Sequence, residues 1–312
     1  MNILLTSIGR RVSLVENIRE TIPNVNVIGL DCDQLAPALS FCDVVIIVPK
    51  KIDEQYFLKI DSICDEYKID LIIPLIDTEL LLFASKRDYF LSKGVNINIS
   101  PLDTIRLFRD KYNMYLDLLS MPEMNQPQTC LLKDYKENMF QGNKVILKPR
   151  GGSSSAGIYC LESKQVCSFA NLMMLDHDAY LVQAYIPYEF EVTIDVFVGR
   201  DGDVLEMCQR RRIKTRGGEV SQGITMNDSM LAAHVIKLIK RHAFYGVVNI
   251  QFMFAGEKFF VGEVNPRFGG GYPLAHKAGA NLIEHFISEK KIQSARYQSG
   301  LKMLRYDAAI FI

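Results

Sequence analysis

The sequence has no excess of charge of either sign, because 36 lysine and arginine residues balance 36 aspartate and glutamate residues. This balance excludes a protein that binds nucleic acid or an anionic membrane surface through its overall charge. The seven cysteines form no C-x-x-C pair, and their odd number favours reduced thiols over a disulfide framework. No run approaches the roughly 18 apolar residues of a membrane helix, and the first residues lack the cleavage site of a signal peptide. We therefore expect a cytoplasmic protein without a membrane or nucleic-acid partner.

Glycine is scarce at the place where a dinucleotide-binding protein would need it. Gly9 is the single glycine between Thr6 and Arg11, whereas the G-x-G-x-x-G fingerprint has three. Asp31 follows about 20 residues later, as a ribose-binding acid would, but we interpret it as a turn residue after a strand. A nicotinamide-dependent oxidoreductase is therefore disfavoured.

Residues 1 to about 105 alternate short apolar runs with segments of helical spacing, which predicts an open parallel sheet covered by helices on both faces. Ligands of such sheets bind beyond the carboxyl ends of the strands. Arg10 and Arg11 follow the first expected strand, and Asp77 and Glu79 follow the fourth. Arg10 and Arg11 could neutralise an anionic substrate or cap the surface of the next helix, and both interpretations stay open. The expected strands are Ile3–Leu5, Val25–Leu30, Val44–Val48, Leu71–Pro74 and Val95–Ile99.

The segment 258–267 reads as a strand of bulky and β-branched residues that ends at Pro266. Glu263 and Asn265 are two residues apart, so both side chains point to one face of that strand. Their carboxylate and amide oxygens are ligands suited to Mg²⁺, and Arg267 brings a guanidinium to the same side. An edge strand that ends in a polar turn is the alternative.

Together with the strand before it, this segment resembles the metal-binding strand of the ATP-grasp superfamily. In members similar to carbamoyl-phosphate synthetase, the preceding strand, here Val247–Phe254, carries a further metal ligand, and Gln251 stands at its position. The resemblance implies a metal site of Gln251, Glu263 and Asn265. It also implies ATP and Mg²⁺ as cofactors, with Mn²⁺ as an alternative ion, and a catalytic role for Arg267.

A second part of the resemblance lies upstream, in the segments expected to contact the phosphates of ATP. The segment 102–119 predicts one helix, on which Lys111 follows an Asp as a phosphate-binding residue does in the family. The segment 144–158 is a strand, a Gly/Ser-rich loop and a second strand, and it lacks the G-K-[ST] of a Walker A loop. It resembles the glycine-rich lid of ATP-grasp proteins; a flexible hairpin tip is the alternative. The residues implied are Lys148, with a catalytic role as well, and Gly151, Gly152, Ser153 and Ser154 of the loop.

The segment 180–197 resembles the hinge between the lobes of ATP-grasp proteins, where backbone groups meet adenine. Gln183 would face the adenine edge, although many members have an acid at that place. Glu189 and Glu191 share one strand face, and we prefer Glu189 for the ribose because of its distance to the hinge. The hinge residues implied are Ala184, Tyr185 and Ile186.

Five of the seven residues from 210 to 216 are basic, which is a strong local charge in a neutral protein. No aromatic residue interleaves them for base stacking, so an RNA-binding patch is disfavoured. An anionic substrate, an acyl phosphate or the phosphates of ATP are the better partners. Strand alternation pairs Arg210 with Arg212 and Arg211 with Ile213; we expect Arg210 and Arg212 to face the site as catalytic residues and Ile213 to lie in the core.

The resemblance covers nearly the whole chain and implies an α/β fold of three parts. These are an N-terminal parallel α/β domain (1–105), a connector with the glycine-rich lid (106–187), and an antiparallel metal-bearing part (188–312). The last part is expected to include a helix over 274–286 and a final strand over 302–312. The implied activity is that of a stand-alone, ADP-forming carboxylate–amine (or carboxylate–thiol) ligase, which uses an acyl phosphate. The alternative is a nucleotide-binding sensor or accessory subunit without turnover. The expected partners are small carboxylate and amine substrates, and a homodimer is the commonest assembly for such chains.

Overall fold

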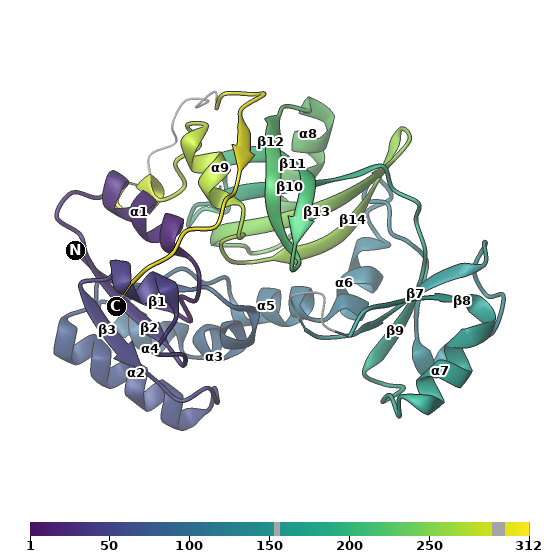
Figure 1. The fold of residues 1–312 in the computed structure, drawn as a ribbon, viewed down its shortest axis with the longest axis horizontal. Helices are drawn as coiled ribbons and strands as arrows, with labels where there is room; N and C mark the ends of the chain where they lie inside the picture. The colour runs from purple at the N-terminus through teal and green to yellow at the C-terminus, as the bar shows by residue number, and fades with distance from the viewer. Residues whose placement is uncertain (153–156, 289–296, 312) are drawn as a thin grey trace.

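The computed structural model of the chain describes residues 1–152, 157–288 and 297–311, which form a five-stranded, a four-stranded and a six-stranded sheet (Figure 1). We call the parts built on these sheets the N-terminal, central and C-terminal lobes. The sheets use the consecutive stretches 2–97, 129–184 and 190–304. The predicted domain limits at 105 and 187 fall between these stretches and stay a prediction. Within the described residues, no helix is long and apolar enough to cross a bilayer.

The N-terminal lobe confirms the predicted parallel sheet, because all of its strand pairs are parallel. Its strand order is β3-β2-β1-β4-β5, so the chain moves outward from β1 to β3 and then returns to the other side of β1. The carboxyl ends of β1 and β4 therefore form the switch point of the sheet, where the connections diverge. The elements are β1 Asn2–Thr6, α1 Val12–Thr21, β2 Asn26–Asp31, β3 Val44–Ile47, α2 Glu54–Tyr67, β4 Leu71–Pro74, α3 Leu80–Ser85, α4 Arg87–Ser92 and β5 Asn96–Ile97.

The helix predicted over 102–119 is broken, which corrects the sequence-based expectation. It consists of α5 Leu102–Arg109 and α6 Lys111–Leu118, and Asp110 between them has an extended backbone with φ −102° and ψ 103°. The Asp110 side chain accepts hydrogen bonds from the backbone N–H groups of Tyr112 and Asn113, so it caps a new helix. A helical periodicity does not reveal this break, because the apolar spacing continues across it.

The central lobe is a small antiparallel sheet with the order β6-β9-β7-β8. In Figure 1 it stands apart from the rest of the chain, with one short helix against it. Its core is formed by apolar side chains from the sheet and from that helix. The elements are β6 Thr129–Leu131, β7 Lys144–Pro149, β8 Tyr159–Glu162, α7 Val166–Leu172 and β9 Tyr180–Ala184.

The C-terminal lobe is an antiparallel sheet with the order β14-β13-β10-β11-β12-β15. One face is apolar and packs on α8 Ser229–Arg241, whereas the other face carries polar side chains. The predicted helix over 274–286 is shorter, with α9 Tyr272–Lys277 and a separate 3₁₀ turn Glu284–Phe286, and the predicted last strand is limited to β15. The strands are β10 Phe190–Val198, β11 Val204–Arg216, β12 Glu219–Met226, β13 Gly246–Ala255, β14 Lys258–Asn265 and β15 Lys302–Leu304.

The outer edge of β14 is covered by the connector that leads into the central lobe. The carbonyl of Asn125 accepts a hydrogen bond from the backbone N–H of Val261 at 3.0 Å. The side-chain amide of Asn125 donates to the carbonyl of Phe259 at 3.1 Å. Two backbone groups of an edge strand thus have partners within the chain.

The N-terminal and C-terminal lobes are joined behind the site by polar contacts at the start of β13. The Asn98 side chain accepts a hydrogen bond from the Val247 backbone N–H at 2.9 Å. A Cβ at Gly246 would lie 2.1 Å from the same Asn98 oxygen, and Gly246 has φ +75°. Only glycine therefore suits this close approach.

Candidate functional site

The predicted metal-binding residues come together at the end of β14. Glu263 lies directly opposite Gln251 in the pairing of β14 with β13, and Asn265 lies opposite Asn249. The Asn265 side-chain nitrogen is 3.5 Å from Glu263 Oε2. The structure thus brings the oxygens of Gln251, Glu263 and Asn265 to one face of the sheet, as strand alternation predicts.

Arg267, just beyond the strand, is held by a residue of the N-terminal lobe. Its Nε and Nη2 donate to the two carboxylate oxygens of Asp77 at 3.1 and 2.8 Å. Burial opposes ionisation of Asp77, but the charge and hydrogen bond of Arg267, with Arg109 and Lys111 nearby, outweigh it and hold the pKa of that carboxyl below its usual range. The pair therefore fixes the guanidinium at the junction of the two lobes.

Lys111 connects the metal strand with the glycine-rich loop. Its ammonium lies 3.8 Å from Glu263 Oε1 and donates to the carbonyl of Gly152 at 3.0 Å. The start of the loop is anchored nearby, because the Arg150 guanidinium donates from Nε to the Asp110 carboxylate at 2.8 and 2.9 Å. The helix break at Asp110 thus serves to place Lys111 against both elements.

Lys148 is a buried cation on β7 and is only 8% exposed. Its ammonium donates to Gln183 Oε1 at 2.9 Å, and the Gln183 amide donates to Thr129 Oγ1 at 2.8 Å. Burial lowers the pKa of Lys148 to about 8; the negative charge of Glu263 opposes this shift and the positive charge of Lys111 adds to it. Lys148, Lys111 and Glu263 therefore form one electrostatic cluster.

A cleft opens between the lobes beside this cluster. Within it, Arg109 is the cation that the sequence-based reasoning missed: its Nε is buried and has no hydrogen-bond partner among the described residues. Nothing in the spacing of α5 distinguishes this arginine from a surface one. The cleft is lined by Asp77, Phe108, Arg109, Lys111, Met114, Gly152, Glu263, Val264, Asn265 and Pro266.

The basic segment forms the second half of β11, and its alternation is as predicted. Arg210 lies opposite Thr193 and Arg212 opposite Glu191, on the polar face of the sheet. Arg212 pairs with Glu191 at 2.8 Å and donates to Gln251 at 3.4 Å, so it reaches the predicted metal ligands. The expectation that Ile213 lies in the core is wrong, because Ile213 is 52% exposed.

Arg210 has a buried partner and supports the turn that follows Arg267. Its Nε donates to Asp195 at 2.6 Å, and Asp195 also accepts from Asn249 at 2.6 Å. A Cβ at Gly271 would lie 2.1 Å from Arg210 Nη1, and a Cβ at Gly269 would lie 2.3 Å from the Asn249 nitrogen. These contacts show that Arg210 supports the turn formed by Gly269, Gly270 and Gly271, which we call the glycine turn. The predicted catalytic role of Arg210 stays a prediction.

The predicted hinge joins β9 to β10, and its contacts separate the two glutamates. Glu189 precedes β10, is exposed, and accepts a hydrogen bond from the Gly256 backbone N–H at 3.0 Å, at the far turn of β13 and β14. Glu191 lies on the polar face with Arg212. The contacts therefore place Glu191, and not Glu189, beside Arg212 and the predicted metal ligand Gln251, while the predicted role of Glu189 at the ribose stays a prediction. In the hinge itself, the backbone N–H groups of Ala184 and Tyr185 donate to the carbonyls of Gln128 and Lys144, respectively. The carbonyl of Ile186 accepts a hydrogen bond from the backbone N–H of Tyr188.

The loop residues are partly outside the described part of the chain. Gly151 and Gly152 are exposed at the end of β7, in the position predicted for a phosphate-binding loop. Ser153 and Ser154 lie outside the described residues.

Glu79 is a second acid at the switch point of the N-terminal sheet. It is fully buried and accepts hydrogen bonds from Thr6 Oγ1 and Ser7 Oγ, each at 2.8 Å, and from the Tyr56 hydroxyl. Burial raises its pKa, with the three hydrogen bonds opposing this and the charge of Asp31 adding to it. Glu79 therefore shapes the loop after β1 from beneath, and Asp31 accepts from the Gly9 N–H at 2.7 Å on the other side.

The residues at the end of β14 fit a hard divalent cation, since they offer one carboxylate and two amide oxygens on one face. Among the described residues, no group of three or more His, Cys, Asp or Glu side chains could hold a metal ion. A cation bound by Gln251, Glu263 and Asn265 would thus keep positions for other oxygen ligands, which is the pattern of Mg²⁺ bound with substrate phosphates.

Two family models match the chain. Residues 3–98 match the model described as "PylC-like, N-terminal domain". Residues 176–306 match the model described as "ATP-grasp in the biosynthetic pathway with Ter operon". The second match includes the hinge, the basic segment of β11 and the metal strand.

The carbamoyl phosphate synthase large chains of Thermoplasma acidophilum and Thermoplasma volcanium are similar in sequence. Each is 24% identical to this chain, over 242 and 238 residues. In both cases the alignment covers 70% of this chain and 23% of the relative. The chain thus spans less than a quarter of the length of these curated relatives.

Solved structures share the fold over nearly the whole chain. The biotin carboxylase domain dimer of Hydrogenobacter thermophilus 2-oxoglutarate carboxylase, in complex with MgADP, ADP and bicarbonate, has a TM-score of 0.76 at 13% identity and covers 96% of this chain and 73% of its own. The N5-carboxyaminoimidazole synthetase of Staphylococcus aureus, complexed with ADP, has a TM-score of 0.70 at 17% identity, with 97% and 79% covered. The matched family models and the sequence relatives agree that residues 176–306 resemble an ATP-grasp domain, and the solved structures share the three-sheet fold of nearly the whole chain.

Proposed function

We propose that the chain is an ATP-dependent carboxylate–amine ligase, which forms an acyl phosphate and releases ADP and phosphate. The observation that carries this proposal is a cleft between the lobes that is lined by Lys111 and Glu263. The charges of both residues act on Lys148, and Arg267 is bonded to Asp77 of the cleft lining. Phosphoryl transfer requires mainly positioning and neutralisation of phosphate oxygens, and this set supplies both. The named activities of the sequence relatives and the ADP in the solved structures support the same assignment.

In this proposal, ATP lies between the central and C-terminal lobes. Lys111 and Lys148 neutralise its phosphates, and the backbone of Gly151 and Gly152 lies close to them. Adenine meets the hinge at 184–186, with Gln183 both at its edge and bonded to Lys148. Of the two candidate acids, Glu191 holds the ribose in preference to Glu189.

Gln251, Glu263 and Asn265 would hold Mg²⁺, or Mn²⁺ in its place. When bound, the ion supplies charge neutralisation between the phosphates of ATP. The chain itself contributes the carboxylate of Glu263 and the position of Lys111, which lies 3.8 Å from that carboxylate.

In the first step, a carboxylate oxygen of the substrate attacks the γ-phosphorus. The bond from that phosphorus to the β-phosphate oxygen breaks, and ADP leaves with the bond's electron pair. Arg267, fixed by Asp77, stabilises the charge on the transferred group. Arg212, which reaches Gln251, is placed to do the same, whereas the buried Arg210 acts through the turn it supports.

In the second step, an amine attacks the acyl carbon of the acyl phosphate. The carbon–oxygen bond to phosphate breaks, the amine loses a proton, and an amide and phosphate are released. A thiol in place of the amine would give a thioester by the same route.

ADP release tests the proposal. The protein is incubated with Mg²⁺-ATP and pools of carboxylic acids with amino acids and other amines, and the rate is compared with that of Glu263→Ala. We expect release that requires one acid and one amine and falls at least about a hundredfold in the variant. Glu257→Ala, in the exposed turn before β14, is the matched control and should leave the rate unchanged.

ATP binding without turnover across broad pools would instead favour a nucleotide-binding sensor or an accessory subunit. The short span of the chain relative to its curated relatives makes this outcome informative. A protein that binds no ATP at all would contradict both assignments.

A further inference from the structure

The loop after β1 lies at the switch point of the N-terminal sheet and leads into an uncapped helix. Ser7 and Gly9 have φ values of 48° and 51°, which turn the chain sharply. The following helix, α1, has Arg11 at its N-cap with no side-chain cap, and no acidic residue in its first turn. Switch points of open α/β sheets bind ligands, and free N–H groups at the start of a helix favour anions.

Arg11 places a guanidinium at this switch point, and no carboxylate of the described residues lies within hydrogen-bond distance of it. Among the described residues, its hydrogen bond is one from Nη1 to the Phe268 carbonyl at 3.5 Å, the outer limit for such a bond. A guanidinium has five N–H donors, so most of its donors remain free for another acceptor. Burial and the neighbouring charge of Arg267 lower the pKa of Arg11 to about 10, with Glu219 and Asp77 opposing and Arg305 adding to the shift.

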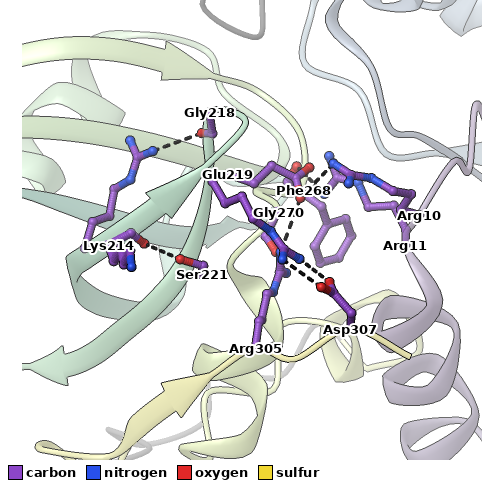
Figure 2. A network of polar contacts seen from close by, with 12 residues as sticks. Arg10, Arg11, Lys214, Gly218, Glu219, Ser221, Phe268, Gly270, Arg305 and Asp307 are labelled. Carbon is purple, nitrogen blue, oxygen red and sulfur yellow. Dashed lines mark hydrogen bonds and ion pairs between the residues drawn. The ribbon is translucent and has the colours of Figure 1, made fainter. Parts of the chain in front are cut away.

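Two more arginines converge on the same place from different elements, and Figure 2 shows them around Glu219. Arg305, just after β15, donates from Nη1 to Glu219 Oε2 at 3.2 Å and from Nη2 to the Gly270 carbonyl. Arg10 is exposed, and its Nη2 lies 3.9 Å from the same Glu219 oxygen. The carboxylate of Glu219 therefore interacts with three arginines: it contacts Arg305 and Arg10, and its charge also acts on Arg11.

The neighbouring carboxylates do not neutralise this excess of positive charge, because they are paired with other arginines. Asp77 is occupied by Arg267 through both oxygens, and Asp307 is occupied by both terminal nitrogens of Arg216. In the C-terminal lobe, Arg210, which supports the turn after Arg267, has its own buried carboxylate, Asp195, at 2.6 Å. The cluster of Arg10, Arg11 and Arg305 around Glu219, which we call the arginine crevice, departs from that pattern.

We propose that the arginine crevice binds an anionic group, a carboxylate or a phosphate, of the co-substrate that reacts with ATP, separate from the group that is activated. The proposal rests on the proposed function for the identity of the ligand as a co-substrate. Arg267 lies between the two places: Asp77 holds it on the ATP side, and its charge acts on Arg11 on the crevice side. A molecule whose reacting carboxyl lies at Arg267 would thus extend its second anionic group to Arg11. Glu219 occupies the crevice as an internal anion until the ligand arrives.

Anion binding without nucleotide tests the crevice by itself. Inorganic phosphate and succinate are titrated into the whole protein at constant ionic strength, and binding is followed by calorimetry and by the shift in Tm. We expect at least one of the two to bind, with Arg11→Gln weakening its affinity about tenfold or more, because a charge-assisted hydrogen-bonding partner is lost. Arg305→Gln should weaken it as well, and Glu219→Gln should strengthen it, because the competing internal anion is gone.

Arg106→Gln is the matched control, since Arg106 is an exposed arginine that pairs with Asp103 at 3.4 Å on α5. Phosphate alone as the bound probe would identify a phosphorylated co-substrate, and succinate alone a polycarboxylate; both would establish the shared anion chemistry. No binding of either probe, equal binding by wild type and Arg11→Gln, or weaker binding by Glu219→Gln would overturn the proposal.

The failure of the crevice can be told from the failure of the ligase assignment. Once a co-substrate is identified by ADP release, Arg11→Gln should raise its KM about tenfold and leave the affinity for ADP unchanged. Loss of ADP affinity in Arg11→Gln would show that the arginine acts on the nucleotide or the fold instead. Absent ADP release with intact phosphate or succinate binding would contradict the ligase and leave the anion site standing.

Discussion

Lys148 is a charged side chain in a place where charge is unfavourable, and its main partner is the neutral amide of Gln183. The pKa of about 8, against an ordinary 10.5, expresses that burial. Between these two pH values the unfolded chain binds more protons than the folded chain. The contribution of Lys148 to the free energy of unfolding therefore rises as the pH increases from about 8 to 10.5.

We predict that nucleotide binding takes up a proton at Lys148. Phosphate oxygens beside the ammonium favour its charged form, so ADP should bind with uptake of up to about one proton at pH 8.5. Its affinity should fall as the pH rises above 8. Calorimetry in buffers of different ionisation enthalpy measures the number of protons.

Lys148→Gln should bind ADP more weakly and without this uptake. A wild-type binding enthalpy that is the same in every buffer at pH 8.5 would contradict the assignment of Lys148 to the phosphates. Lys144→Gln, an exposed lysine on the same strand, should behave as wild type.

The individual residues of the candidate site differ in how far the sequence reveals them. The placement of Glu263 and Asn265 on one face follows from strand alternation, and Gln251 was assigned through the family resemblance of the preceding strand; their role as metal ligands stays a prediction. Asp77 and Arg11 were not assigned, because the partner of Asp77 lies 190 residues away and that of Arg11 lies 257 residues away. Charge and spacing within one element carry no information about such contacts.

At the scale of elements, the alternation of side chains along β11 was predictable, but the point at which neighbouring parts of the fold stop covering the strand was not. Arg210 and Arg212 share the polar face as expected. The pairing of β11 with β10 ends at Arg212, so Ile213 lies beyond the central part of the sheet, where β11 pairs with β12 alone, and its side chain is exposed. The helix break at Asp110 was missed for a related reason, since its cause is the cap and the contact with Arg150 on another element.

The glycine turn after Arg267 should be intolerant of a methyl group. We predict that Gly271→Ala destabilises the protein by about 3 kcal/mol, because its Cβ would lie 2.1 Å from Arg210 Nη1 and 2.8 Å from Val220 Cγ1. Arg210 is held by Asp195 and is only 1% exposed, so it has little freedom to move away. Urea unfolding followed by circular dichroism measures the change.

Gly151→Ala is the control for this substitution, since a Cβ there would meet no atom within 4 Å. It should change the free energy of unfolding by less than about 0.5 kcal/mol. Equal stability of Gly271→Ala and wild type would mean that Arg210 does not support the turn.

At the scale of the whole molecule, the N-terminal and C-terminal lobes meet on two sides. Asn98 and Val247 join them behind the site, and Asp77 and Arg267 join them within it. The second contact is both a structural link and a way to orient a candidate catalytic residue. The architecture of this junction follows from the fold family, but the particular pair had to be seen in the structure.

We predict that Asp77→Asn weakens the junction by about 3 kcal/mol, because it leaves the largely buried Arg267, whose side chain is 14% exposed, beside Arg11 and Arg109 without its carboxylate. The pKa of the Asp77 carboxyl is lowered in the folded state. The stabilisation by the pair is therefore present above a pH of about 3.8, the ordinary pKa of this carboxyl, and is lost as the pH falls below it. Urea unfolding at pH 7 and pH 3 compares the two conditions.

The difference between Asp77→Asn and wild type should shrink at pH 3. Asp103→Asn, whose side chain is 96% exposed, should change stability by less than about 0.5 kcal/mol at either pH. A difference at pH 7 no larger than that control would contradict the role of this pair.

The cover that Asn125 places over β14 has a consequence for self-association. An edge strand is where the sheets of two molecules ordinarily join into larger aggregates, and β14 also carries Glu263 and Asn265. Because Asn125 occupies the outward backbone groups of Phe259 and Val261, a second chain can add to this edge only after the connector has moved away. Detachment of the connector around Asn125 would therefore expose the edge of β14 to aggregation, even while every sheet remains intact.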